Sequence, residues 1–310
     1  MLSDIQNLVE NDLSVYPEST YKAFIIGEQP SNGARSPLLW NKAFKAFDID
    51  ATMVPLDVKQ NNLSKLFDKL EIDSTNIGGC IAAPYKEKIA KILGKNNLIE
   101  EASNIGAINN FFKKDLKSNK FFATNTDGEA ALNQIKELLT FNNTKITDLK
   151  EVVILGTGGT SKAVAAYLSK QLSINCKIKL FYHNKHTIGY FYPERKITAY
   201  KWALKEKYLI TADLIINCTS VGTGNLIDIC PFNLDELIQQ HASKKLSIYD
   251  VNYLPSPPKL IEVAKLKSIN AIDGKGMNLI QAVLAFKNST SNLLNDLSIS
   301  NIKKAMLSEN

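Results

Sequence analysis

The chain has 310 residues, of which 45% are hydrophobic and 22% are charged, and its formal net charge is +6. This is the composition of an ordinary soluble globular protein with about two domains. Lysines are spread among Asp and Glu, so no nucleic-acid-binding face is expected. Four cysteines without a Cys-x-x-Cys pair, together with three histidines, argue against a metal site. The first residues lack a signal-peptide pattern and no apolar run approaches ~18 residues, so we expect a cytoplasmic protein without a membrane partner.

The first 145 residues predict an α/β domain with a mostly parallel sheet. Apolar residues at helical spacing predict an amphipathic helix within residues 1–16. Ser36 and Pro37 predict the start of another helix, with Ser36 as its N-cap. The remaining expected elements are strands at 22–26, 51–58, 76–84, 108–112 and 121–124, and helices over 63–70, 84–93 and 126–139. Residues 141–148 are polar and rich in turn formers, so we expect the domain boundary there.

From residue 150 onward, strands and helices alternate as they do in a parallel sheet. The expected strands are 152–155, 178–182, 197–200, 214–218, 247–251 and 269–272. Two helical stretches follow Gly276, over residues 277–287 and 291–307. The pattern predicts a doubly wound domain over about residues 146–276.

A glycine-rich turn, Gly156-Thr157-Gly158-Gly159, follows the first of these strands. Gly156 allows a tight turn, and Gly158 lets the backbone approach a pyrophosphate at the start of a helix. Ser161 is small enough for the helix to pack closely on the strand. A glycine turn alone is weak evidence, but in this strand–turn–helix context it predicts dinucleotide binding.

The residues after the second strand of this domain indicate which dinucleotide is bound. NAD-binding sites place a carboxylate there for the ribose 2′-hydroxyl, whereas basic residues suit the 2′-phosphate of NADP. No Asp or Glu lies between Glu151 and Glu194, and the strand ends in His183-Asn184-Lys185. We therefore expect NADP as the cofactor, with Lys185 or His183 contacting the 2′-phosphate.

The ordered motifs between about residues 26 and 286 resemble the shikimate dehydrogenase family. Each motif is modest, but their order and spacing together are specific. They are Gly27 with Arg35-Ser-Pro37 and Asn41, Ala83-Pro-Tyr-Lys86, Ile105-Gly-Ala-Ile-Asn109, Asn125-Thr-Asp-Gly128, the glycine turn, Asn184-Lys185, Ile216-Asn-Cys-Thr-Ser-Val-Gly222, Asp250-Val-Asn-Tyr-Leu-Pro255 and Gly276-Met-Asn-Leu-Ile-Gln281.

The resemblance implies an α/β fold of two domains with the active site in the cleft between them. The first is a catalytic domain, residues 1–145, joined by the C-terminal helices 277–310, and the second is a Rossmann-type NADP-binding domain. The reaction implied is the reversible reduction of 3-dehydroshikimate to shikimate, a cyclic polyol carboxylate, by a monomer or homodimer.

The family motifs also imply roles for individual residues. Lys86 and Asp127 form the catalytic pair, which agrees with the chemistry, since a lysine beside a carboxylate can hold the substrate oxygen and transfer its proton. The other assignments are substrate contacts at Ser36, Asn109, Tyr253 and Gln281, and cofactor contacts at Gly156, Thr157, Gly158, Gly159, Asn184, Lys185, Thr219, Val221 and Gly274.

The chain departs from the family pattern around the substrate. The family usually has Ser-x-Ser-Pro where this chain has Ala34-Arg-Ser-Pro, and Asn-Val-Thr where it has Cys80-Ile-Ala82; Trp40 replaces a customary His. Weakly polar groups thus replace donors to a polyol acid, and unpaired substrate hydroxyls are costly. Two alternatives remain open: a related dehydrogenase acting on quinate or an aminated or otherwise altered shikimate, and an NADP-binding protein with little turnover.

Overall fold

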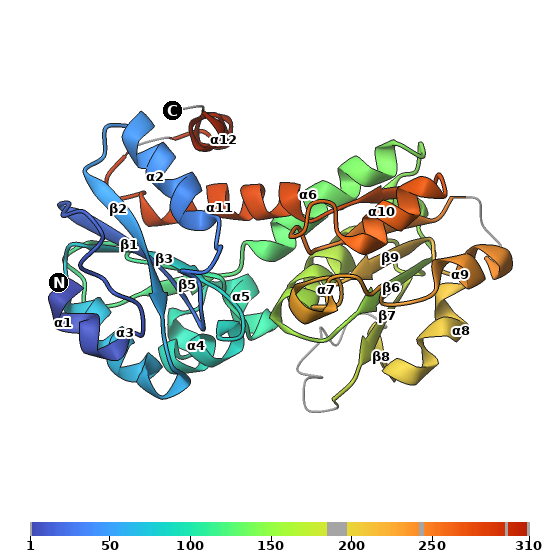
Figure 1. Ribbon diagram of the computed structural model, residues 1–310, viewed down its shortest axis with the longest axis horizontal. Helices are drawn as coiled ribbons and strands as arrows, with labels where there is room; N and C mark the ends of the chain where they lie inside the picture. Colours follow the sequence, from blue (N-terminus) through green and yellow to red (C-terminus); the bar gives the residue numbers. More distant parts are fainter. Residues whose placement is uncertain (1, 185–196, 242–244, 295–296, 309–310) are drawn as a thin grey trace. The chain divides into compact units, whose positions relative to one another are not determined.

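The computed structural model describes residues 2–184, 197–241, 245–294 and 297–308 (Figure 1). It divides into two compact units, Met1–Thr126 with Leu279–Asn310, and Asp127–Asn278. The predicted boundary near residue 145 lies after α6 (Asp127–Thr140), whereas α6 itself belongs to the second unit. There α6 lies against α7 (Gly159–Gln171), and the Leu138 carbonyl accepts a hydrogen bond from Asn270. The polar stretch after α6 is therefore a loop within the second unit.

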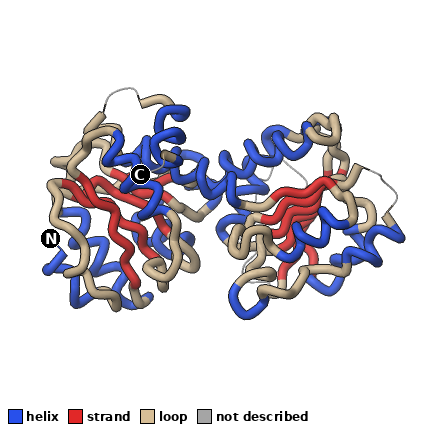
Figure 2. Tube along the Cα trace, turned by 45° about the horizontal axis from the view of Figure 1, so that its top comes forward, coloured by secondary structure: helices blue, strands red, loops and turns tan. Residues whose placement is uncertain are grey.

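The first unit contains a mixed five-stranded sheet with the order β2-β1-β3-β4-β5. Its strands are among those drawn in red in Figure 2. Its central strand, β1 (Tyr21–Gly27), pairs in parallel with β2 (Ala51–Asp57) and β3 (Asn76–Ile81). The short strands β4 (Asn110–Phe112) and β5 (Phe122–Thr124) continue the sheet as an antiparallel edge. The sheet is thus mostly parallel, as predicted.

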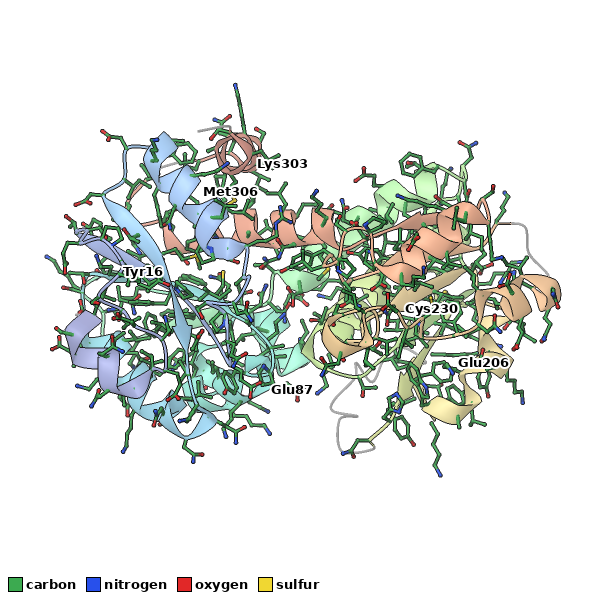
Figure 3. The ribbon with its side chains drawn as sticks, viewed as in Figure 1. Tyr16, Glu87, Glu206, Cys230, Lys303 and Met306 are labelled. Carbon is green, nitrogen blue, oxygen red and sulfur yellow. The ribbon has the colours of Figure 1, made fainter. Side chains whose placement is uncertain are left out.

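Alternating residues of β1 point to two different cores, as the two-residue period of a strand requires. Phe24 and Ile26 pack in the core that includes α1 (Leu2–Ile5), α3 (Leu63–Ile72), α4 (Lys86–Leu93) and α5 (Glu100–Ile105). Ala23 and Ile25 pack in the opposite core, to which α2 (Ser36–Ala46), the unit-1 part of α11 (Lys275–Ser289) and α12 (Ile299–Leu307) contribute. In Figure 3, α12 carries the buried Met306 and the exposed Lys303.

Two predicted helices are shorter than expected. The predicted helix within residues 1–16 has only α1 and a 3-10 turn ending at Leu8, because the Gln6 side chain bonds to the Asn11 carbonyl and the Leu13 amide and stabilises a loop. The helix predicted over 291–307 begins only at Ile299. There the Ser298 hydroxyl accepts the Asn301 N–H at 3.1 Å and acts as the N-cap.

The second unit contains a parallel six-stranded sheet with the order β11-β10-β9-β6-β7-β8. Strand order reverses between β6 and β9, and ligands of doubly wound folds bind at the carboxyl ends of the strands at such a point. Every predicted strand of this unit is present, whereas the short helices α8, α9 and α10 were not predicted. The elements are β6 (Glu151–Leu155), β7 (Lys177–Tyr182), β8 (Ile197–Lys201), α8 (Lys205–Leu209), β9 (Leu214–Asn217), α9 (Leu234–Gln240), β10 (Ser247–Asp250), α10 (Lys259–Leu266) and β11 (Asn270–Ile272).

The α/β fold, with a doubly wound parallel sheet in the second unit, agrees with the prediction. Among the described helices, none combines the length and the apolar character that crossing a membrane requires.

Candidate functional site

The glycine turn links β6 to α7 at the point where strand order reverses. Gly156 has φ +104°, and an added Cβ would lie 3.2 Å from the Cys218 carbonyl oxygen, so this position requires glycine. Gly158 is the N-cap of α7, and no heavy atom lies within 4 Å of an added Cβ there. The space beside Gly158 is therefore open at the start of α7, and the first amides of a helix suit a phosphate group. The turn's other predicted contacts are Thr157, which is buried, and Gly159, the first residue of α7.

A hydrogen-bonded network joins the carboxyl ends of β9 and β10 beside this turn. Asn217 and Asp250 are paired in the sheet register, and the Asn217 side-chain amide donates to Oδ1 of Asp250 at 3.1 Å. The Asn252 side-chain amide donates to the carbonyls of Thr219 and Val221, each at 3.0 Å. The network thus fixes the loop that carries the two predicted cofactor contacts Thr219 and Val221.

Asp250 is the unusual member of this network. Its Oδ1 also accepts the Asn252 backbone N–H at 3.0 Å, whereas its buried Oδ2 has no hydrogen-bond partner among the described residues. Burial raises the pKa of Asp250 to about 7, against the lowering effect of its hydrogen bonds to Asn252 and Asn217. Protonation of this carboxyl group therefore falls within the neutral pH range.

Gly274, another predicted cofactor contact, lies against the same loops. Its backbone N–H donates to the Asn252 carbonyl at 2.9 Å. An added Cβ would lie 1.9 Å from the Val251 carbonyl oxygen, so a side chain at this position would displace the backbone after β10.

The predicted 2′-phosphate contacts follow β7. His183 and Asn184 are exposed after the last residue of that strand. Lys185 lies outside the described residues. The carboxyl ends of β6 and β7 are tied together, because the Gly156 N–H donates to the Phe181 carbonyl at 2.9 Å.

The two predicted catalytic residues each begin a helix. Lys86 is the first residue of α4 and half-buried, and its carbonyl accepts the Ile108 N–H at 3.0 Å in the first unit. Asp127 is the first residue of α6 in the second unit, where a carboxylate is stabilised by the helix dipole. Its side chain is buried, and Oδ2 lies 3.5 Å from the Thr160 hydroxyl of α7.

Two predicted substrate residues are joined in the first unit. The Asn109 side-chain amide donates to the Thr126 hydroxyl at 2.8 Å and to Oε1 of Gln281 at 3.1 Å. Oδ1 of Asn109 accepts the Thr126 N–H at 2.7 Å, and the Thr126 hydroxyl donates to the Gln281 carbonyl at 3.1 Å. These contacts fix both amide side chains from three separate segments of the chain.

The other two substrate predictions have different surroundings. The prediction that Ser36 is an N-cap is wrong: α2 begins at Ser36, Arg35 is the capping residue in helical conformation, and Ser36 is buried in the first turn. Tyr253 is half-buried in the loop after β10. These positions do not test contact with a substrate, so both assignments stay predictions.

The residues that depart from the family pattern belong to one apolar cluster. Ala34, Trp40, Cys80 and Ala82 all pack in the core that includes α2 and α11. The Trp40 ring lies 5.3 Å from that of Phe286, edge to face. The four residues are therefore part of one continuous apolar core, in which Trp40 and Cys80 are buried and Ala34 and Ala82 partly buried.

The sequence analysis did not single out Thr126, Thr160 or the Asn217–Asp250–Asn252 network. A signal was present for the network. Asn217 and Asp250 each end an apolar run that forms a strand, and the ends of neighbouring parallel strands meet at one edge of a sheet. Thr126 and Thr160 are found only from the fold, because their partners lie far away in the sequence.

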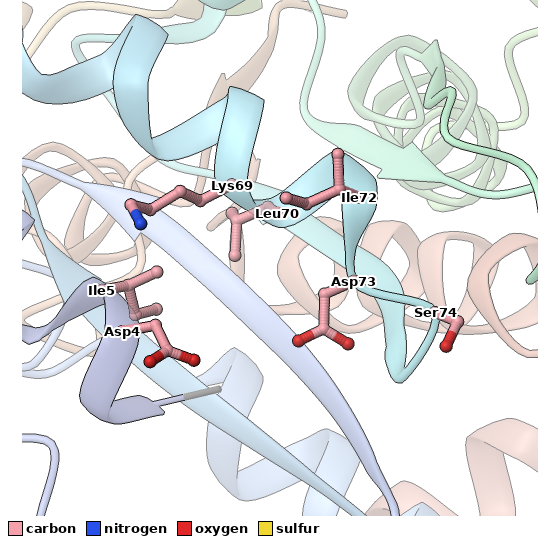
Figure 4. Close-up of a pocket in the computed structure, with 7 residues that line it drawn as sticks. All are labelled: Asp4, Ile5, Lys69, Leu70, Ile72, Asp73 and Ser74. Carbon is pink, nitrogen blue, oxygen red and sulfur yellow. The ribbon is translucent and has the colours of Figure 1, made fainter.

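A cavity lies in the first unit, away from the predicted site residues. Its volume is about 480 Å³, and it is lined by Asp4, Ile5, Lys69, Leu70, Ile72, Asp73 and Ser74 (Figure 4). Asp73 and Ser74 precede β3, whereas Lys86 follows it, so the cavity is at the opposite end of that strand. None of the predicted site residues lines it.

Comparison with known proteins supports the family resemblance. Residues 25–111 match the model of the shikimate dehydrogenase substrate binding domain. The chain is 29% identical over 288 residues to a shikimate dehydrogenase (NADP(+)) of Alkaliphilus metalliredigens, which covers 90% of this chain and 94% of the relative. The match therefore extends over both units.

Solved structures share the fold. A shikimate 5-dehydrogenase of Thermus thermophilus in complex with NADP(H) and shikimate has a TM-score of 0.71 at 21% identity, over 92% of this chain and 98% of that chain. A quinate dehydrogenase of Corynebacterium glutamicum in complex with NAD has a TM-score of 0.73 at 20% identity, over 94% and 99%. The family model, the sequence relatives and this fold all indicate the shikimate dehydrogenase family.

Proposed function

We propose that this protein is an NADP(H)-dependent dehydrogenase that reversibly reduces 3-dehydroshikimate to shikimate. The observation that carries the proposal is the glycine turn at the reversal of strand order, in a chain whose relatives over nine-tenths of its length are shikimate dehydrogenases (NADP(+)). The net charge of +6 favours the approach of an anionic cofactor and an anionic substrate.

The residues of the second unit fit a dinucleotide. Gly156 leaves the turn tight against Cys218, and the open space at Gly158 accommodates a pyrophosphate at the first amides of α7. Thr219, Val221 and Gly274 would border the same site, while Asn184 and Lys185 would meet the 2′-phosphate. The absence of Asp and Glu from residues 152–193 supports NADP over NAD.

Lys86 and Asp127 would handle the proton. Bound NADPH supplies a hydride to the carbonyl carbon. Lys86 would donate a hydrogen bond to the carbonyl oxygen and release a proton to it as the alcohol forms. Asp127 would keep the lysine charged and orient its ammonium group, since a nearby carboxylate favours the charged form.

The contiguous apolar cluster supports a second candidate substrate. Ala34 and Ala82 cannot donate hydrogen bonds from their side chains, and Cys80 is a weak donor. A site with these residues would tolerate a ring that lacks or alters one hydroxyl, so quinate or an aminated shikimate is the alternative. An NADP-binding protein with little turnover is the third candidate.

A steady-state substrate comparison tests these candidates. Purified protein with NADP(H) is assayed by nicotinamide absorbance on 3-dehydroshikimate, shikimate, quinate and an aminated shikimate. The largest kcat/KM on the shikimate pair supports the first candidate, and a larger value on another acid supports the second. Tight NADP binding without turnover on any of them supports the third. In the Ala34→Ser/Ala82→Thr variant, we expect kcat/KM for shikimate to rise relative to the other acids.

A further inference from the structure

Two aromatic side chains lie next to each other just beyond the carboxyl ends of the neighbouring strands β7 and β8. Strands β7 and β8 are parallel, and Tyr182 and Lys201 form the last residue pair in their register. His183 and Trp202 are the next residues of the two strands. Their rings are stacked, with centroids 4.3 Å apart and planes inclined by 27°.

Trp202 is fixed in place, whereas His183 faces solvent. The indole of Trp202 packs on the apolar core of the unit. The Lys205 ammonium lies 5.0 Å from the Trp202 ring centroid and pairs with the Glu206 carboxylate at 2.8 Å. Both Lys205 and Glu206 lie on α8, and Glu206 is labelled in Figure 3. His183 is exposed, and Trp202 covers one face of its ring. A ligand that stacks on His183 would therefore use the face opposite Trp202.

His183 is connected to the glycine turn through a backbone hydrogen bond between β7 and the residue after β6. The Gly156 N–H bonds to the Phe181 carbonyl, and His183 lies two residues beyond Phe181. Two residues of strand span roughly 7 Å. An anion-binding backbone and an exposed aromatic ring at the neighbouring carboxyl ends of β6 and β7 suit a ligand with a phosphate and a planar ring.

We propose that His183, backed by Trp202, is the stacking platform for the adenine ring of the bound nucleotide. The proposal rests on the proposed function, since it assigns a contact to the cofactor which that function requires. The competing interpretation is that the stack only covers the end of β8. That interpretation explains the half-buried Trp202 but gives no role to the exposed face of His183.

The experiment uses 2′,5′-ADP, which carries the adenosine, the 5′-phosphate and the 2′-phosphate without the nicotinamide. Its Kd and that of NADPH are measured by calorimetry on the wild type, His183→Ala and His183→Phe, with Phe141→Ala as a matched control at an exposed aromatic of the same unit. Because the chain has two tryptophans, the fluorescence of Trp202 is obtained by subtracting the emission of Trp202→Phe from that of the wild type.

We expect His183→Ala to bind 2′,5′-ADP roughly tenfold more weakly. His183→Phe, which keeps a ring face, and the control should stay within about threefold of the wild type. Saturating 2′,5′-ADP should change the Trp202 emission. Unchanged affinity in His183→Ala with silent Trp202 emission, in a protein that binds and oxidises NADPH normally, overturns the platform alone. A wild type that binds neither nucleotide overturns the proposed function and the platform with it.

Discussion

The side-chain amide of Asn109 donates to Oε1 of Gln281 at 3.1 Å, although 172 residues separate the two in the sequence. Asn109 precedes β4, whereas Gln281 lies on α11, so the fold of the first unit brings them together. Both residues were predicted substrate contacts from the family motifs. Their mutual bond and the bonds to Thr126 hold polar side chains in place before a ligand arrives, which lowers the entropic cost of binding.

Gln281→Leu should weaken substrate binding, because it removes one amide from this arrangement while Asn109 keeps its bond to Thr126. We expect kcat/KM for the substrate to fall about tenfold, mainly through KM, as the loss of one neutral hydrogen bond implies. Lys287→Leu, at an exposed position of the same helix, is the control. Equal kinetics in wild type and Gln281→Leu would remove Gln281 from the substrate site.

Gly156→Ala should destabilise the protein, whereas Gly158→Ala should leave its stability nearly unchanged. At Gly156, with φ +104°, alanine is strained and crowds the Cys218 carbonyl, so we expect a loss of about 1–3 kcal/mol in the free energy of unfolding. At Gly158, with φ −74° and open space, stability should stay within about 0.5 kcal/mol.

Gly158→Ala should nevertheless weaken the binding of the nucleotide. The methyl group of Gly158→Ala would occupy the space in which a pyrophosphate approaches the backbone, so NADPH should bind at least about tenfold more weakly. Denaturant unfolding and calorimetric titration measure the two effects. A Gly158→Ala protein with unchanged NADPH affinity would place the phosphates elsewhere.

Asp250 should make stability depend on pH. Its folded-state pKa of about 7 lies above the ordinary value of 3.8, so between these values the folded protein binds a proton that the unfolded chain does not. The contribution therefore favours folding at low pH and is lost as the pH rises toward 7. From pH 5 to pH 8, the wild type should therefore lose on the order of 2–4 kcal/mol of unfolding free energy that Asp250→Asn, whose amide does not titrate, keeps.

Urea unfolding at both pH values measures this difference, with Asp228→Asn, at an exposed position, as the control. The same pH dependence in wild type and Asp250→Asn would show that another group titrates.

The sequence predicted the strands of both sheets well, since buried parallel strands have apolar, β-branched runs bounded by turn residues. Val152–Leu155 and the glycine turn are the clearest example, because strand, turn and helix follow within thirteen residues. Helix ends were less predictable. Side chains such as Gln6 and Ser298 compete for backbone groups, and their partners are known only from the fold.

In the candidate site too, some features were predictable from the local sequence and others only from the fold. Residues identified by local motifs, such as Lys86 and Gly156, were predictable one by one. The Asn109–Gln281 bond depends on segments that are distant in the sequence, so no local pattern reveals it. The pairing of Asn217 with Asp250 could have been expected from the ends of two neighbouring strands, but the burial of the Asp250 carboxyl group is known only from the fold. The first unit ends at Thr126 because α6 packs on α7 of the second unit. The sequence instead suggested a boundary at the polar stretch after α6.

The central claim is that Lys86 transfers the proton in an NADPH-dependent reduction, and the rate of NADPH oxidation with 3-dehydroshikimate tests it most directly. We predict clear turnover by the wild type and by Lys91→Ala, an exposed lysine on the same helix. Lys86→Ala should lose about 10²–10⁴-fold in kcat, as general acid–base catalysis implies, while binding NADPH with wild-type affinity. Full activity in Lys86→Ala, or no turnover of 3-dehydroshikimate by the wild type, would contradict this account.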